Sequence, residues 1–133
     1  MAVTRFGVSL EEDLREALDE YVQENNFANR SQAIRHLISN NIVQSKWKCN
    51  NVVAGAIVLL YDHHKNDLSI RLNEVQHDFH EEILSSQHFH LNHDNCLEII
   101  AVKGPSFRLT ELSDKLISLK GIQHGKLVMS RTD

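Results

Sequence analysis

Residues 75–101 read VQHDFHEEILSSQHFHLNHDNCLEIIA, and this stretch predicts a β-hairpin that is rich in histidine. His88 and His90 are two residues apart in a segment that alternates like a strand, so both side chains leave the same face. Turn-forming residues follow at 92–95, and a second apolar run opens at Cys96. Folding the turn would place the Cys96 sulfur beside the two imidazoles, and this set of ligands predicts a transition-metal site.

The hairpin lies within a longer succession of apolar runs and amphipathic stretches in residues 51–133. The predicted elements are a strand at 52–61, a helix that Asp67 caps, the hairpin, a helix between Pro105 and Gly121, and a strand at 122–129. The order βαββαβ is that of the ferredoxin-like fold, to which small regulatory domains of the ACT type belong. Because many unrelated functions use this fold, the fold alone does not indicate a function.

The first fifty residues predict one strand followed by two amphipathic helices. Phe6, Val8 and Leu10 alternate with small or polar residues, which indicates a strand with one apolar face. Apolar side chains at spacings of three and four then predict two helices, the second capped by Asn29 or Ser31. A lone strand and two helices cannot enclose a core in so short a segment, so we expect an intertwined dimer.

This order of elements resembles the ribbon-helix-helix family of DNA-binding proteins, in which two chains pair their strands into a ribbon that enters the major groove. The resemblance implies that Arg5, Gly7 and Ser9 face the bases, where an arginine can make a bidentate contact to guanine. It also implies that the N–H groups near Asn29, at the start of the second helix, hold a phosphate. The alternative is a dimerisation arm in which Arg5 is solvated.

The expected fold is therefore α+β, with an N-terminal ribbon-helix-helix (βαα) followed by a ferredoxin-like βαββαβ domain of the ACT type. We expect a DNA-binding and dimerisation domain at residues 1–50 and a metal-binding and tetramerisation domain at residues 51–133. The polar residues 45–50 form the predicted linker.

Taken together, the two halves resemble the NikR family of nickel-responsive transcriptional regulators over essentially the whole chain. The motifs are V-Q-H at residues 75–77, H-x-H-x5-C from His88 to Cys96, and G-I-Q-H-G at residues 121–125. The resemblance implies one square-planar Ni(II) per subunit, bound by His88, His90 and Cys96 of one chain and by His77 of a neighbouring chain. It implies a homotetramer, a dimer of dimers whose metal sites lie between subunits.

The residues by themselves leave the metal open. A tetragonal site with nitrogen and sulfur ligands suits Ni(II) or Cu(II), whereas a tetrahedral arrangement of the same ligands suits Zn(II). Glu98 shares a strand face with Cys96, which predicts that its carboxylate hydrogen-bonds a ligating imidazole. His63 and His64 are expected to be solvated, and His93 is expected to be structural.

Two further expectations concern the rest of the molecule. The resemblance implies that Lys65, in the loop before the third helix, contacts the DNA backbone once nickel has ordered that loop. Gln32 and His36 stand where family members can carry acidic ligands for a potassium-like ion, which leaves a second cation site open.

The composition limits the kinds of binding partner and the cellular location that we expect. A net charge of −4 shows that the chain has no general basic coat, so DNA contacts must come from a few well-placed side chains. No apolar run approaches the roughly 20 residues that cross a bilayer, and no secretory signature is visible. Two cysteines do not make a disulfide framework, so we expect a cytoplasmic protein without membrane association.

The expected function is that of a nickel-responsive repressor of nickel uptake, in which Ni(II) allosterically promotes binding to double-stranded operator DNA. Two other functions are open: a metal-storage or buffering protein, and an ACT-type regulator that senses an amino acid. We do not expect an enzyme, because no nucleophile–base pair or glycine-rich phosphate loop is visible. Four protein ligands would also close the metal site to a substrate.

Overall fold

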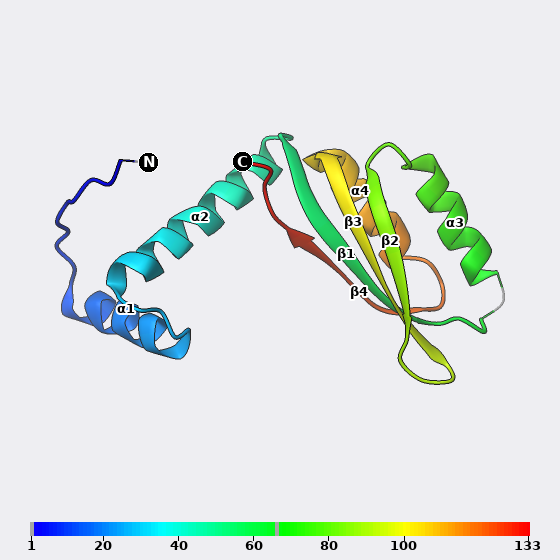
Figure 1. The fold of residues 1–133 in the computed structure, drawn as a ribbon, viewed down its shortest axis with the longest axis horizontal. Coiled ribbons are helices and arrows are strands. Elements are labelled where there is room, and N and C mark those ends of the chain that lie inside the picture. Colours follow the sequence, from blue (N-terminus) through cyan, green and yellow to red (C-terminus); the bar gives the residue numbers. More distant parts are fainter. Residues whose placement is uncertain (1, 66) are drawn as a thin grey trace. The chain divides into compact units, whose positions relative to one another are not determined.

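A computed structural model describes residues 2–65 and 67–133. The elements are α1 (Glu12–Glu24), α2 (Arg30–Lys48), β1 (Val52–Asp62), α3 (Leu68–Asp78), β2 (Ile83–His90), β3 (Asn95–Pro105), α4 (Ser106–Ile117) and β4 (Ile122–Met129) (Figure 1). The chain divides into two compact units, Met1–Asn41 and Ile42–Asp133. Among the described residues, no helix is long and apolar enough to cross a membrane.

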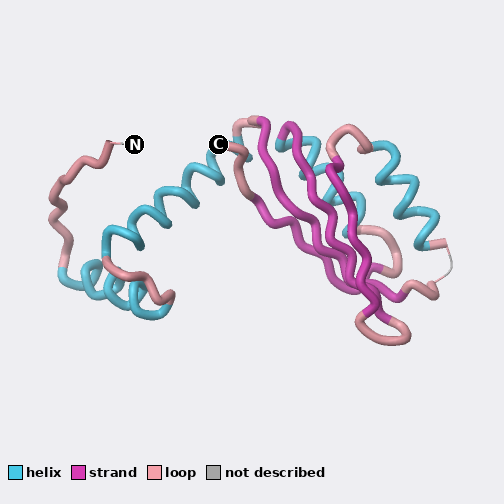
Figure 2. Tube along the Cα trace, viewed as in Figure 1, coloured by secondary structure: helices cyan, strands magenta, loops and turns pink. Residues whose placement is uncertain are grey.

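The second unit is built on a four-stranded antiparallel sheet with the strand order β2-β3-β1-β4 (Figure 2). Helix α3 connects β1 to β2, and α4 connects β3 to β4, so each connection skips one strand of the sheet. Both connections therefore join strands that run in the same direction, as in a split βαβ unit. The predicted α+β class and the order βαββαβ are confirmed for this unit.

The core of the second unit lies between the two helices and one face of the sheet. Alternate residues of the central strands point into it, including Ile57 of β1 and Ile100 of β3, which are fully buried. Helix α4 contributes Leu109, Leu112 and Leu116 at helical spacing, all with no exposed surface. A single chain thus encloses this core completely.

The predicted linker at residues 45–50 is wrong in part, because α2 continues to Lys48. Trp47 in its last turn is buried in the core of the second unit, and its indole N–H donates to the carbonyl oxygen of Ser130 at 2.8 Å. Gly55 makes room for the indole: a Cβ there would lie 3.3 Å from the Trp47 ring and 2.5 Å from the Val128 carbonyl oxygen. A buried tryptophan with a satisfied N–H stabilises the helical end.

The first unit has almost no interior. Helix α1 buries no residue, and Ala33 is the one buried side chain among residues 2–41. Residues 2–11 carry neither helix nor strand in the single chain, so the predicted strand at the N-terminus stays a prediction. A strand needs a partner for its backbone groups, and a single copy of this unit offers none among its described residues.

Side-chain pairs connect the two helices of the first unit. The Arg30 guanidinium donates to both oxygens of Asp19, at 2.7 and 2.9 Å, and Arg15 adds a third hydrogen bond at 3.0 Å. At the start of α2, the Asn29 side chain accepts a hydrogen bond from the Gln32 N–H at 2.9 Å, which confirms Asn29 as its cap. By contrast, Asp67 has a left-handed backbone before α3 and makes no side-chain cap hydrogen bond, so that predicted cap is wrong.

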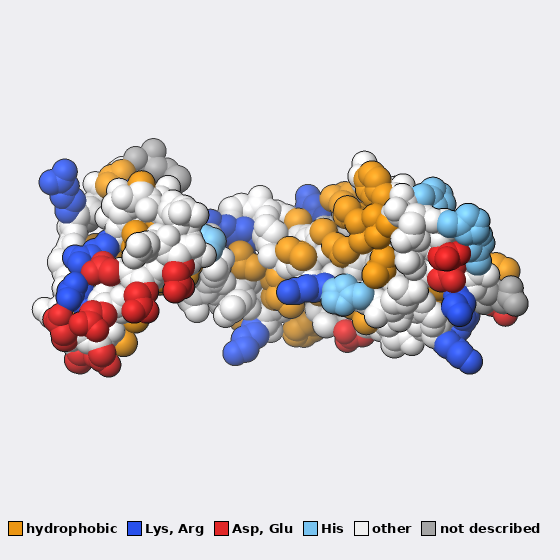
Figure 3. All heavy atoms as spheres, turned by 90° about the horizontal axis from the view of Figure 1, so that it is seen from below, with side chains coloured by type: hydrophobic (Ala, Val, Ile, Leu, Met, Phe, Trp, Pro, Cys, Tyr) orange, Lys and Arg blue, Asp and Glu red, His pale blue; other side chains and the backbone are white. Residues whose placement is uncertain are grey.

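The second face of the sheet carries apolar side chains that remain accessible. Val52, Phe89 and Val128 are 56%, 46% and 50% exposed, and they come from three different strands. Figure 3 shows hydrophobic side chains gathered in a patch on the unit that contains the sheet. A patch of this kind is typical of a protein–protein contact surface.

Candidate metal centre

The predicted hairpin is confirmed as β2 and β3. The two strands pair antiparallel, with His90 opposite Cys96 and His88 opposite Glu98. In the turn, the Asn92 side chain accepts hydrogen bonds from the next backbone N–H groups, including that of Asn95 at 2.9 Å. Residues directly opposite each other on antiparallel strands share a face, so His88, His90 and Cys96 lie on the same side of the sheet. That side is the one covered by the helices.

The carboxylate residue Glu98 lies in this site and has no exposed surface. Its carboxylate accepts hydrogen bonds from the Tyr61 hydroxyl at 2.7 Å, the Gln76 amide at 2.9 Å and the Ser86 hydroxyl at 2.7 Å. The Nε2 atom of His88 lies 3.6 Å from Oε2 of Glu98. The carboxylate therefore lies beside a predicted ligand, where it can orient the imidazole.

Tyr61 holds the same imidazole from the other side, because its hydroxyl lies 3.3 Å from the Nδ1 atom of His88. Burial raises the pKa of the Tyr61 phenol, and the hydrogen bond that it donates to Glu98 raises the pKa further. The phenol is therefore neutral at physiological pH and acts as a hydrogen-bond donor. Both ring nitrogens of His88 thus have a polar neighbour, Tyr61 at Nδ1 and Glu98 at Nε2.

Sequence reasoning missed three residues of this network: Tyr61, Gln76 and Ser86. The sequence held a signal for one of them, because Ser86 lies two residues before His88 and therefore shares its strand face. Tyr61 of β1 lies opposite Cys96 of β3, a pairing between distant segments that only the structure shows. Gln76 precedes His77 on α3, and its contact with Glu98 depends on how the helix packs on the sheet.

The four predicted ligands do not form a compact group within one chain. Cys96 is buried and free, while His77 is exposed in the last turn of α3. Among the described residues, three-ligand groups with all atoms within 4.8 Å of one another occur elsewhere. They are Asp62 with His63 and His64, and His64 with His93 and Asp94.

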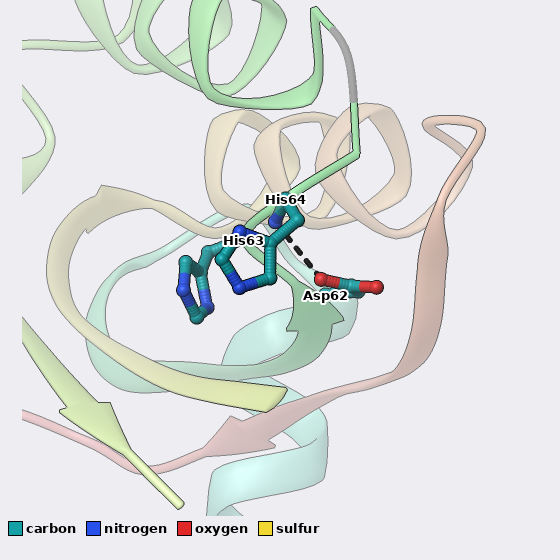
Figure 4. A group of neighbouring side chains, drawn as sticks. All are labelled: Asp62, His63 and His64. Carbon is teal, nitrogen blue, oxygen red and sulfur yellow. Dashed lines mark hydrogen bonds between the residues drawn. The ribbon is translucent and has the colours of Figure 1, made fainter. Parts of the chain in front are cut away.

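Figure 4 shows the first of these groups, where β1 ends. The backbone N–H of His64 donates to the Asp62 carboxylate at 2.9 Å. His63 was expected to be solvated, but it is only partly exposed, and its buried Nδ1 atom has no hydrogen-bond partner among the residues that the structure describes. The group lies beside the hairpin because Asp62 pairs with Asn95, the first residue of β3.

The residues predicted to contact DNA are all at the surface. Arg5, Gly7, Ser9 and Asn29 are exposed in the first unit, and Lys65 is exposed in the loop after β1. Arg5 and Asn29 line one hollow, to which Ser31 and Arg35 also contribute. The structure thus brings together the predicted base-contacting arginine and the start of α2.

Gln32 and His36, the positions considered for a second cation site, have local structural roles. The Gln32 side chain accepts a hydrogen bond from the Ala28 N–H at 2.6 Å. The His36 ring lies 5.3 Å from the Phe27 ring, in a small aromatic group that also includes Tyr21.

Residues 54–130 match the family model of the NikR C-terminal nickel-binding domain. A nickel-responsive regulator of Syntrophus aciditrophicus is 47% identical over 128 residues, which cover 96% of this chain and 93% of that protein. Another, of Thermococcus kodakarensis, is 46% identical over 133 residues, with coverage of 99% and 96%.

Two solved structures have a similar fold at low sequence identity. The ACT domain from the GTP pyrophosphokinase of Chlorobium tepidum has a TM-score of 0.51 at 16% identity, over 59% of this chain and 100% of that chain. An uncharacterized protein from Thermotoga maritima has a TM-score of 0.54 at 19% identity, over 59% and 98%. These similarities show an ACT-like fold for the second unit.

Proposed function

The chain belongs to the NikR family of nickel-responsive regulators, and from this membership we propose that it is a repressor whose binding to operator DNA requires Ni(II). As a member of this family it is a nickel-binding regulator and not an enzyme. The observation that carries the proposal is the register of the hairpin, which puts His88, His90 and Cys96 on one face of the sheet beside the buried Glu98.

The proposed nickel site has one ion per subunit. His88, His90 and Cys96 supply two nitrogens and a sulfur, a donor set that suits a tetragonal Ni(II) or Cu(II) site. His77 supplies the fourth ligand to a neighbouring subunit, which its exposure on α3 supports. A metal in this place would act as a structural link between subunits, and its four protein ligands would leave no position for a substrate.

The hydrogen bonds of Glu98 support a route from the metal to the rest of the unit. The carboxylate is bonded to Ser86 on the hairpin strand and to Gln76 on α3, directly before His77. Fixing His88 by coordination therefore restrains both the hairpin and α3. The loop that precedes α3 carries Lys65, the proposed phosphate contact, while Asn66 lies outside the described residues. Allosteric coupling of this kind typically amounts to about 1–3 kcal/mol.

For the first unit we propose a ribbon-helix-helix dimer. Phe6, Val8 and Leu10 are 77%, 63% and 42% exposed in the single chain, so the alternating apolar face needs a second copy to cover it. In the paired ribbon, Arg5, Gly7 and Ser9 would face the bases of double-stranded DNA, and Asn29 would lie near a phosphate.

Two such dimers would form the homotetramer, held together by the second units. The half-exposed apolar side chains on the second sheet face support this association. Both cysteines are free, which supports a reducing cytoplasmic location.

The proposal is tested by fluorescence anisotropy with DNA from the promoter of the chain's own gene, with and without Ni(II). We expect binding only with nickel, loss of high-affinity nickel binding and of the DNA response in His90→Ala, and no change in His80→Gln, an exposed histidine outside the ligand set. Arg5→Ala should lose specific DNA binding and still bind nickel. Nickel-dependent DNA binding by His90→Ala would refute the ligand assignment.

The same titration separates the other two functions. A storage or buffering protein would bind nickel with no change in its affinity for DNA. An amino-acid sensor would respond to its amino acid and not to the metal.

A further inference from the structure

The end of α3 that carries His77 is held by one arginine from another helix. Arg108, in the first turn of α4, donates from Nε to the Glu82 carboxylate at 2.8 Å and from Nη2 to the Asp78 carbonyl oxygen at 3.4 Å. Its Cζ atom also lies 4.0 Å from the centroid of the Phe79 ring. A single guanidinium thus contacts three of the five residues that follow His77 in the chain.

The segment that Arg108 contacts is itself attached to the core and to the sheet. Phe79 and Glu82 are both buried. The carbonyl oxygen of Glu82 accepts a hydrogen bond from the Lys103 N–H of β3 at 2.8 Å. Arg108 therefore connects the end of α3 to two other elements, α4 through its own backbone and β3 through Glu82.

Helix α3 has few other means of fixing its last turn. It contains 11 residues, and no side chain caps its first turn. Isolated helices shorter than about 12–15 residues are marginal in water, so the ends of a helix of this length depend on tertiary contacts. A cation beside the last carbonyl groups of a helix is also favourable, because these groups carry partial negative charge. Removing Arg108 should therefore loosen the last turn of α3.

His77 lies between two neighbours that are both held. The Gln76 side chain donates to Glu98 at 2.9 Å, and the Asp78 carbonyl oxygen accepts from Arg108. The side chain of His77 itself is exposed. The backbone of His77 is thus fixed on both sides, while its imidazole is free to reach a group outside its own chain.

We propose that Arg108 is a positioning residue for His77, which it presents to a neighbouring subunit by fixing the last turn of α3. This inference rests on the nickel site proposed above, in which His77 is the fourth ligand. A ligand that is ordered before the metal arrives loses less conformational entropy when it binds. Without the contacts of Arg108, nickel binding should weaken although every ligand is still present.

The contacts of Arg108 are tested first without metal, in a variant that combines Arg108→Gln with Glu82→Gln. The second change is needed because Arg108→Gln alone would leave a buried carboxylate without its ion-pair partner. The control combines Lys115→Gln with Glu111→Gln, which removes a neighbouring ion pair of the same helix. Lys115 also lies over the Phe79 ring, at 5.5 Å from its centroid, so the control alters a charge at the same ring.

Hydrogen exchange of the nickel-free protein measures the effect. The N–H groups of Phe79 and His80 donate to the carbonyl oxygens of Gln76 and His77 and close the end of α3. We expect both amides to exchange several-fold faster in the Arg108→Gln, Glu82→Gln variant than in the control, with the protection of β1 unchanged in both. Equal exchange in the two variants would overturn the proposal.

The positioning role is tested by titrating the same full-length variants with Ni(II) in competition with a chelator. We expect the Arg108→Gln, Glu82→Gln variant to bind nickel about 10-fold more weakly, as is typical when a group that orients a ligand is removed. The control should bind as the unaltered chain does. Arg108→Lys should fall between them, because it keeps the positive charge and loses the planar fork of donors.

A double-mutant cycle with His77→Ala separates positioning from a general effect on stability. If Arg108 acts through His77, changing Arg108 and Glu82 in the His77→Ala background should cause no further loss of nickel affinity. The same fold-loss with and without His77 would show that Arg108 only stabilises the fold, and would overturn the positioning role.

Failure of the proposed nickel site would look different. If His77→Ala bound nickel as tightly as the unaltered chain, the ligand assignment would be refuted and the positioning role with it. The exchange measurement uses no metal, so it would still decide whether Arg108 fixes the end of α3.

Discussion

Both units of the chain carry helices with a regular apolar stripe, but the stripe is buried in the second unit and exposed in the first. In the second unit, Leu109, Leu112 and Leu116 lie on one stripe of α4 and are fully buried against the sheet. In the first unit, α1 carries an equally regular stripe, yet it buries no residue and its Leu14 is 51% exposed. An amphipathic helix becomes part of a core only where another layer covers it. The metal-binding half therefore encloses its core within one chain, and we expect the half proposed to bind DNA to need a second chain.

The largest expected effect comes from removing part of the complete core. Leu112→Ala should lower the free energy of unfolding of the second unit by about 2–5 kcal/mol, because it leaves a cavity in a fully packed place. Urea denaturation followed by Trp47 fluorescence measures it, since this single tryptophan is buried in the same core. A loss well under 1 kcal/mol would mean that the second unit also depends on partners for its packing.

The next effect concerns the buried carboxylate of the second unit. Glu98→Gln leaves one acceptor oxygen where the charged carboxylate offers two. The hydrogen bonds of Tyr61, Gln76 and Ser86 are therefore weakened or rearranged, and unfolding becomes easier by about 1–3 kcal/mol. Nickel affinity should fall as well, because the negative charge 3.6 Å from the His88 Nε2 atom is removed. The control is Glu111→Gln on the exposed side of α4, which should change neither the denaturation midpoint nor the affinity. Equal affinities in the two variants would show that Glu98 has no part in metal binding.

The contrast between the units is tested most directly in α1. Leu14→Ala should destabilise the first unit by about 1 kcal/mol per chain when the protein is concentrated, and by much less when it is dilute. The reason is that Leu14 is half exposed in one chain, and in the proposed dimer a partner would cover it. Hydrogen exchange of the α1 amides across a dilution series measures this. Protection of α1 that is independent of concentration would show that the first unit folds alone.

The smallest effect is that of the exposed ion pairs between α1 and α2. The hydrogen bond from Arg30 lowers the pKa of Asp19 below its ordinary value of 3.8, so these pairs stabilise the fold above that value. Their contribution is lost as the pH falls through the lower pKa of the folded state. Asp19→Asn should therefore lower the urea midpoint of the first unit at pH 7 and have little effect in strong acid. Asp13→Asn, on the same helix, serves as the control, and a difference that persists in acid would contradict this assignment.

Local sequence patterns predicted the hairpin and the place of Glu98, because strand alternation and turn formation depend on residues that are close together in the sequence. The convergence of Tyr61, Gln76 and Ser86 on that carboxylate could not be predicted in the same way, since it depends on packing between β1, α3 and β2. The helical end around Trp47 was missed for the same reason: a polar stretch became helix because its one large aromatic ring fits beside Gly55. The predicted N-terminal strand stays a prediction, because its pairing would involve two chains and one chain cannot display it.

The contact between the His63–His64 segment and the hairpin turn is a long-range effect as well. It follows from the pairing of Asp62 with Asn95, which brings the end of β1 next to the start of β3. Sequence reasoning treated these histidines separately because each segment alone resembles a polar loop.

The pairing of His90 with Cys96 also limits how this chain can change in length. Side chains alternate between the two faces of a strand, so deleting or inserting one residue in the turn at 91–94 would shift the register by one position. Cys96 would then leave the sheet from the face opposite to His88 and His90, although every proposed ligand would still be present in the sequence. If the proposed ligands bind the metal, the length of this turn is as strictly constrained as the identity of those ligands. The segment should then tolerate exchanges of residues far better than changes in their number.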